Sequence, residues 1–107
     1  KEKISFGDIV IDPAGGEVSK ADKIITLTPK EYHLLCYMAQ NANQILTKQM
    51  ICSEVWKDSY EGYDNTIMVH IRKLRQKLED NPSSPKYIIT VKGLGYKLKI
   101  QRRGSLI

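Results

Sequence analysis

The chain has 107 residues, of which 41% are hydrophobic and 27% charged, and its formal net charge at pH 7 is +5. This length predicts one domain over residues 1–107, with a modest core that needs no disulfide or metal to support it. No apolar run approaches the roughly 20 residues that cross a bilayer, and the first residues show no signal-peptide pattern. Both absences favour a cytoplasmic protein, or a domain of one.

Each of the two cysteines, Cys36 and Cys52, falls in a predicted helix among apolar neighbours. Because thiols stay reduced in the cytoplasm, we expect both to pack as small hydrophobic side chains rather than to form a disulfide. No pair of His or Cys residues has the spacing of metal ligands, so we predict no metal site and no other cofactor.

The N-terminal third predicts a small antiparallel sheet of four strands. Runs of β-branched and aromatic residues lie at 4–6, 9–11, 17–19 and 24–27. Gly, Asp and Pro separate the first three runs, and residues 20–23 form the turn before the fourth. Short apolar runs divided by turn residues are typical of consecutive hairpins.

The first helix is predicted to begin after Thr28 and to run to about Asn41. Thr28 can cap the helix, Pro29 suits the first helical position, and Glu31 can complete a capping box by reaching back. The apolar residues that keep helical spacing are Leu34, Leu35, Met38 and Ala42.

Thr47 predicts the cap of a second helix, which ends near Trp56. The residues expected on its inward face are Met50, Ile51 and Val55. Residues 57–64 then form a polar loop, and either Asp64 or Asn65 is expected to cap the third helix.

Residues 65–78 predict an amphipathic helix with one basic face. At 3.6 residues per turn, the narrow apolar face holds Ile67, Ile71, Leu74 and Leu78. The opposite face holds Asn65, Val69, Arg72, Lys73 and Gln76. The apolar face can anchor in a core while the other meets a polyanion, but most basic amphipathic helices are only solvated surface helices. From the helix alone, both interpretations remain open.

A hairpin follows the third helix. Residues 81–85 end the helix, and strands are predicted at 87–92 and 95–100. Gly93 and Gly95 suit a tight tip, because glycine adopts positive φ at low cost. The Gly-Leu-Gly spacing is not a nucleotide-binding loop, since no helix follows it.

The charges are strongly asymmetric along the chain. Residues 70–107 hold ten Lys or Arg against two acids, a net charge of +8, whereas residues 1–69 hold seven against ten, a net charge of −3. This distribution is expected where one part of a protein must attract phosphate. Together with the order of elements, it predicts an α+β winged helix-turn-helix: an N-terminal four-stranded antiparallel sheet, three helices and a C-terminal β-hairpin wing.

Four sequence blocks resemble the C-terminal effector domain of OmpR/PhoB-type bacterial response regulators, over essentially the whole chain. They are Leu27-Thr28-Pro29-Lys30-Glu31-Tyr32, Ile45-Leu46-Thr47 with Val55-Trp56, Val69-His70-Ile71-Arg72-Lys73-Leu74-Arg75, and Ile89-Thr90-Val91-Lys92-Gly93-Leu94-Gly95-Tyr96. The resemblance implies sequence-specific binding to double-stranded promoter DNA, with helix 65–78 in the major groove and wing 87–100 at the adjacent minor groove or backbone.

The resemblance also implies partners in a two-component phosphorelay. Family members bind direct repeats as head-to-tail dimers, and an N-terminal receiver domain, phosphorylated through a cognate histidine kinase, controls them. The receiver is absent from this chain. The loop at 57–64 matches the segment that the family offers to RNA polymerase.

Roles are implied for single residues of the third helix. Val69 matches a residue that packs on a thymine methyl group, and Lys73 matches a residue that reads bases. His70, Arg72 and Arg75 match positions that face phosphates or support the helix. A hydrogen-bonded structural role for His70 is at least as well supported.

Outside that helix, Trp56 and Thr90 match phosphate contacts, Lys92 a wing residue near the minor groove, and Tyr96 an aromatic residue at the base of the wing. Gln76 can read a base edge or be plain surface. The complete set of predicted DNA contacts is Val69, His70, Arg72, Lys73, Arg75, Gln76, Trp56, Thr66, Thr90, Lys92 and Tyr96.

Two positions depart from the family pattern. Asn65 stands where Arg is frequent in the family, which removes a phosphate contact that the resemblance implies, and Met68 stands where Asp is frequent, which makes that turn more apolar. Sequence preference is therefore expected to differ from that of better-known members.

Two other classes of function compete with DNA binding. A winged helix can serve only protein–protein contacts, in which case salt-dependent binding to duplex DNA would be absent. An enzyme is disfavoured, because the chain lacks paired catalytic carboxylates, a Ser or Cys nucleophile signature and a Walker motif. The acids Asp58, Glu61 and Asp64 share one loop, and a solvated polar loop explains them.

Overall fold

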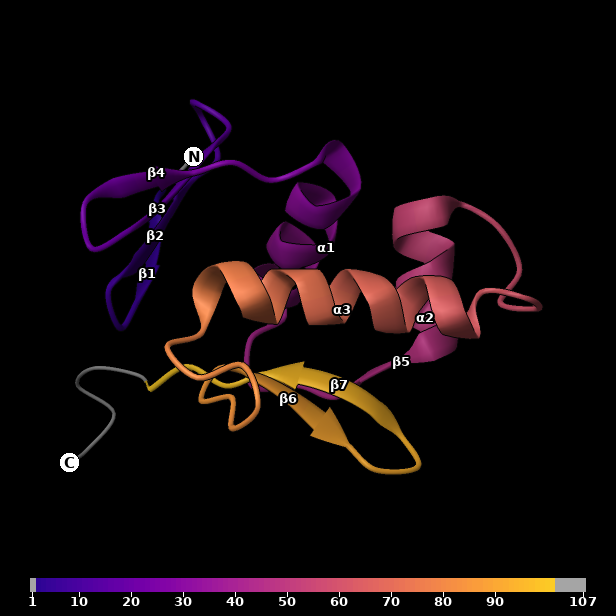
Figure 1. Ribbon diagram of the computed structural model, residues 1–107. Coiled ribbons are helices and arrows are strands. Elements are labelled where there is room, and N and C mark those ends of the chain that lie inside the picture. The colour runs from indigo at the N-terminus through magenta and orange to yellow at the C-terminus, as the bar shows by residue number, and fades with distance from the viewer. Residues whose placement is uncertain (1, 102–107) are drawn as a thin grey trace, which may run out of the picture.

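The computed structural model describes residues 2–101 (Figure 1). Its elements are β1 (Ile4–Phe6), β2 (Ile9–Asp12), β3 (Glu17–Lys20), β4 (Lys23–Ile25), α1 (Pro29–Gln40), β5 (Leu46–Thr47), α2 (Lys48–Ile51), the π-helical turn η1 (Cys52–Trp56), α3 (Asp64–Leu78), β6 (Ile88–Val91) and β7 (Gly95–Leu98). Arg102 and Arg103, two of the ten C-terminal bases, lie outside the described residues. No helix among residues 2–101 is both long and apolar enough to cross a membrane.

The predicted four-stranded N-terminal sheet is confirmed, with the antiparallel order β1-β2-β3-β4. Ala21 and Asp22 both have positive φ and form a two-residue turn between the paired residues Lys20 and Lys23. Two-residue turns of this type match the twist of the strands that they join. Because the turn uses only these two residues, Lys23 is already paired and β4 starts one residue earlier than expected. It also ends at Ile25, two residues short of the predicted strand.

The predicted capping box of α1 is present. Thr28 Oγ1 accepts from Glu31 N–H at 3.2 Å, and Glu31 Oε1 accepts from Thr28 N–H at 3.0 Å. Glu31 is 1% exposed, and its carboxylate also accepts from Lys77 Nζ of α3 at 2.6 Å. Burial raises the pKa of Glu31, but the bonds from Lys77 and Thr28 outweigh it and hold that pKa below its ordinary value. The helix ends at Gln40, so Ala42 lies beyond it.

The second helix differs from the prediction. Thr47 is its cap, as expected, but α2 covers only four residues before the chain widens into η1. Met50, expected inside, is 43% exposed, because the buried stripe is formed by Ile51, Cys52 and Val55. These three residues keep ordinary helical spacing, and Met50, which precedes η1, lies outside the face that they share.

A short strand that the sequence did not predict, β5, completes a second sheet with the order β5-β7-β6. Gly93 has φ +79 at the hairpin tip, as expected. Gly95 serves a different purpose, since a Cβ there would collide with the backbone of Leu46 and Thr47. Glycine at 95 therefore allows β7 to approach β5, and both wing strands are shorter than predicted.

The apolar face of α3 is confirmed, because Ile67, Ile71, Leu74 and Leu78 are all buried. The predicted cap is wrong. Tyr63 is the N-cap residue and makes no side-chain cap, while Asp64 is the first helical residue. The Asp64 carboxylate instead accepts from Lys48 Nζ at 2.7 Å and Tyr60 O–H at 2.8 Å. The helix start is thus tied to α2 and not capped by its own side chain.

The segment between α3 and β6 is organised by Glu79. This residue is 5% exposed, and its carboxylate accepts hydrogen bonds from the backbone N–H groups of Lys86, Tyr87 and Ile88 at 2.7–2.9 Å. Tyr87 in turn packs edge-on against Phe6 of β1, with ring centroids 5.1 Å apart. The end of α3, the start of the wing and the N-terminal sheet therefore meet at one place.

We predict that Glu79→Ala lowers the free energy of unfolding by about 3 kcal/mol, since three hydrogen bonds to a charged acceptor are lost and water replaces them only in part. Urea unfolding followed by the fluorescence of Trp56, the single tryptophan, measures the change. Glu61→Ala removes an exposed acid and should stay within about 0.5 kcal/mol of the parent. A loss below about 1 kcal/mol for Glu79→Ala would contradict the assigned role.

Candidate nucleic-acid interface

The outward face of α3 is exposed and basic. The residues predicted to lie on this face, Asn65, Val69, Arg72, Lys73 and Gln76, are all exposed. Within residues 2–101, neither Arg72 nor Lys73 takes part in an ion pair. Val69 is 40% exposed among these polar and charged residues. An apolar side chain at such a position does not add to the core, so fold stability does not explain a valine there.

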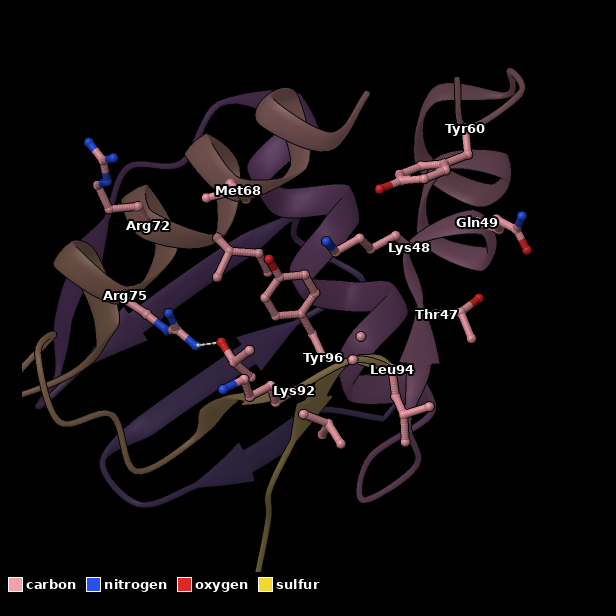
Figure 2. Close-up of a pocket in the computed structure, with 15 residues that line it drawn as sticks. Thr47, Lys48, Gln49, Tyr60, Met68, Arg72, Arg75, Lys92, Leu94 and Tyr96 are labelled. Atoms are coloured by element: carbon pink, nitrogen blue, oxygen red, sulfur yellow. Dashed lines mark hydrogen bonds between the residues drawn. The ribbon is translucent and has the colours of Figure 1, made fainter. Parts of the chain in front are cut away.

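A groove of about 650 Å³ runs between α3, the start of α2 and the wing (Figure 2). Lys48 and Tyr60 line one side, Met68 and Arg72 the other, and the ring of Tyr96 lies between them. Apolar side chains at the floor and cations at the rim suit a ligand with an apolar body and negative charges.

Arg75 connects α3 to the wing. Its Nε donates to the carbonyl oxygen of Ile88 at 3.0 Å, and its Nη2 donates to Thr90 Oγ1 at 2.8 Å. Both acceptors belong to β6, and Figure 2 marks the second bond. Of the two roles predicted for Arg75, the structure therefore shows support of the helix and wing.

The wing is exposed around its tip and buried at its base. Thr90, Lys92 and Leu94 are exposed, and Leu94 reaches 57% at the tip. Tyr96 is only 5% exposed, so little of its ring is free to contact a ligand. Its principal role in this structure is to form the floor of the groove.

The opposite flank of α3 carries an aromatic cluster. His70 Nδ1 lies 2.8 Å from the carbonyl oxygen of Thr66, and its ring packs edge-on against Trp56 with centroids 4.9 Å apart. This supports the hydrogen-bonded structural role for His70. Thr66 and Trp56 are each half-buried. Trp56 also contacts Tyr63, with centroids 5.9 Å apart.

The loop at 57–64 is held by its own tyrosines. Tyr63 O–H donates to Asp58 Oδ2 at 3.1 Å, and Tyr60 O–H donates to Asp64 Oδ1 at 2.8 Å. The hydrogen bonds from Lys48 and Tyr60 hold the pKa of Asp64 below its ordinary value. Glu61 is exposed at the turn. Two of the three acids in this loop are thus engaged within it, and no group of His, Cys, Asp or Glu among residues 2–101 could hold a metal.

The sequence did not reveal two features of this interface. The link from Arg75 to Thr90 and the part played by Lys48 in the groove both depend on residues distant in the chain. Helix periodicity gives only the flank of a helix on which a side chain lies. It does not give the acceptor that the side chain meets.

Comparison with known proteins identifies relatives that share this architecture. The family described as transcriptional regulatory protein, C terminal, matches residues 22–98. YcbL of Bacillus subtilis, described as an uncharacterized transcriptional regulatory protein, is 43% identical over 95 residues, which are 89% of this chain and 42% of that protein. The chain therefore spans about two fifths of the length of this relative.

Solved structures agree with this result. The DNA-binding domain of RstA from Klebsiella pneumoniae, crystallised in complex with the RstA box, superposes with a TM-score of 0.85 at 31% identity, covering 92% of this chain and 98% of that one. DrrB, an OmpR/PhoB homologue from Thermotoga maritima, gives a TM-score of 0.83 at 33% identity, covering 92% of this chain and 45% of its own. The winged helix-turn-helix predicted from the sequence is confirmed.

Proposed function

Since the chain belongs to the family of DNA-binding effector domains of OmpR/PhoB-type response regulators, we propose that it regulates transcription by sequence-specific binding to promoter DNA. The observation that carries the proposal is the exposed face of α3, where Arg72 and Lys73 lie beside Val69 without acidic partners among the described residues. This family of transcription regulators is not an enzyme class.

In the proposed complex α3 enters the major groove. Its 15 residues span roughly 22 Å, and a helix fits the groove, which is about 12 Å wide. Lys73 can donate to guanine O6 or N7, and Val69 can pack on a thymine methyl group. Arg72 offers a planar pair of donors for a phosphate, and Gln76 is free to meet a base edge.

The wing and the aromatic flank hold the DNA backbone. Lys92 extends from the wing toward the adjacent minor groove, and Thr90 contacts a phosphate beside it. On the other flank the indole N–H of Trp56, with Thr66 nearby, meets the opposite strand. Such contacts fix register and orientation without reading sequence.

The whole protein would place this domain in a two-component system. A receiver domain precedes it, a cognate histidine kinase phosphorylates the receiver in the cytoplasm, and two copies bind direct repeats head to tail. The loop at 57–64, with its exposed Glu61, faces RNA polymerase, because acids there repel phosphate and tyrosines are common at protein interfaces.

We expect binding to duplex DNA to depend steeply on salt. Each neutralised phosphate adds about 0.9 to the magnitude of the slope of log K against log salt, so two or more cationic contacts give about 2 or more. A titration on a duplex selected by this protein from a random pool measures the slope. A slope near zero would favour the alternative function, a winged helix that makes only protein contacts.

We expect Lys73 to read sequence and Thr90 to hold the backbone. Lys73→Ala should cost about 1–3 kcal/mol on the selected site and relax the preference at one base pair. Thr90→Ala should weaken binding to selected and scrambled duplexes alike. If both variants showed the same selectivity profile, this division of roles would be refuted.

Glu61→Lys tests the loop. We expect it to leave specific DNA affinity unchanged or slightly raised, because an acid is replaced by a base near phosphate. Activation in a reconstituted transcription assay should fall. The matched control is Glu17→Lys, a charge reversal at an exposed residue of the N-terminal sheet. Activation that survives Glu61→Lys would leave residues 57–64 as a plain solvated loop.

A further inference from the structure

The bond between Arg75 and Thr90 constrains the Thr90 hydroxyl as well as the wing. A hydroxyl group has one proton to donate and two lone pairs that accept. Arg75 Nη2 donates a hydrogen bond to Thr90 Oγ1 at 2.8 Å, so the Thr90 oxygen is the acceptor in this bond. Its own proton must then point elsewhere, and Thr90 lies on the exposed side of β6.

The guanidinium of Arg75 is held from two directions. The bond from Nε to the Ile88 carbonyl oxygen keeps its plane against β6, while Nη2 faces the Thr90 side chain two residues further along that strand. The aliphatic stem lies beside the groove on the flank of α3 that faces the wing (Figure 2). Arg75 therefore already has two partners in the protein without DNA.

We infer that Arg75 is a positioning residue: it locks the wing to α3 and turns the Thr90 hydroxyl proton outward, where it donates to a DNA phosphate. This inference rests on the proposed function. Hydrogen bonds that involve a charged partner are stronger than neutral ones, and chains of hydrogen bonds polarise one another. A hydroxyl that accepts from a guanidinium is therefore a better donor to phosphate than a free one.

The competing arrangement has Arg75 leave β6 on binding and contact phosphate itself. The two arrangements predict different effects of an Arg75 substitution on the slope of log K against log salt. A guanidinium that neutralises a phosphate contributes about 0.9 to the slope. A threonine hydroxyl is neutral and releases no counterion, so its loss changes affinity but not slope.

A double-mutant cycle on the selected duplex separates the two arrangements. We expect Thr90→Val, which removes the hydroxyl but keeps the shape and strand preference, to weaken binding about tenfold. Thr90→Ser should bind like the parent. Arg75→Gln should also weaken binding about tenfold with little change in salt slope, and the double variant should be little weaker than either single one.

Three outcomes would overturn the inference. The first is a double variant about a hundredfold weaker than the parent, which means that the two residues act independently. The second is a slope reduced by about 0.9 in Arg75→Gln. The third is full affinity in Arg75→Lys, because lysine keeps the charge but lacks the fork that spans Ile88 and Thr90.

Controls keep these results separate from folding and from the proposed function. Urea unfolding reports the stability of each variant, and if Arg75→Gln is not folded, Arg75→Lys takes its place in the cycle. Lys23→Gln removes one positive charge from an exposed site on β4 and should leave affinity close to the parent. Salt-dependent binding by the parent chain tests the proposed function itself, whatever the cycle shows.

Discussion

The position of the wing relative to α3 depends on the Glu79 carboxylate. Directly after the helix, it gathers three consecutive backbone N–H groups that would otherwise have no partner at the start of β6. Arg75, one turn earlier in the helix, then reaches Ile88 and Thr90 along the same strand. A guanidinium on the last turn of α3 and a carboxylate directly after it thus fix both the origin and the direction of the wing, and so define the groove between the wing and α3.

The same contacts determine which charges remain at the surface. Among residues 2–101, Glu31 and Glu79 are the two buried charged residues, and each carboxylate accepts hydrogen bonds from donors inside the protein. Asp80, the other acid of the C-terminal part, pairs with Lys20 at 2.8 Å. Glu31, Glu79 and Asp80 are therefore neutralised or enclosed, while Arg72 and Lys73 stay exposed. The charge asymmetry along the sequence becomes a basic face in three dimensions, which is what attraction of a polyanion requires.

Much of the fold could be predicted because its signals are local. The capping box at Thr28 and the period of Ile67, Ile71 and Leu74 each lie within a few residues of their partners. Two failures arise where the partner is distant: β5 needs β7 to exist, and Asp64 bonds Lys48 sixteen residues away. A third is Met50, which is exposed because Ile51, Cys52 and Val55 form the buried face. The candidate site, too, could be predicted only in part. Exposure of Val69 and Lys73 followed from periodicity, whereas the tether of Arg75 and the burial of Tyr96 did not.

Residues of α3 differ in whether the fold already uses them, and this bears on how specificity can vary. On one flank Arg75 is bonded to the wing, and on the other His70 packs on Trp56. Substitutions there disturb the geometry of the whole interface. Asn65 and Met68, which the resemblance led us to expect as departures from the family pattern, are exposed and lie between those flanks. Because exposed positions away from such contacts change stability little, this chain can differ from its relatives at both sites without altering how α3 and the wing are held.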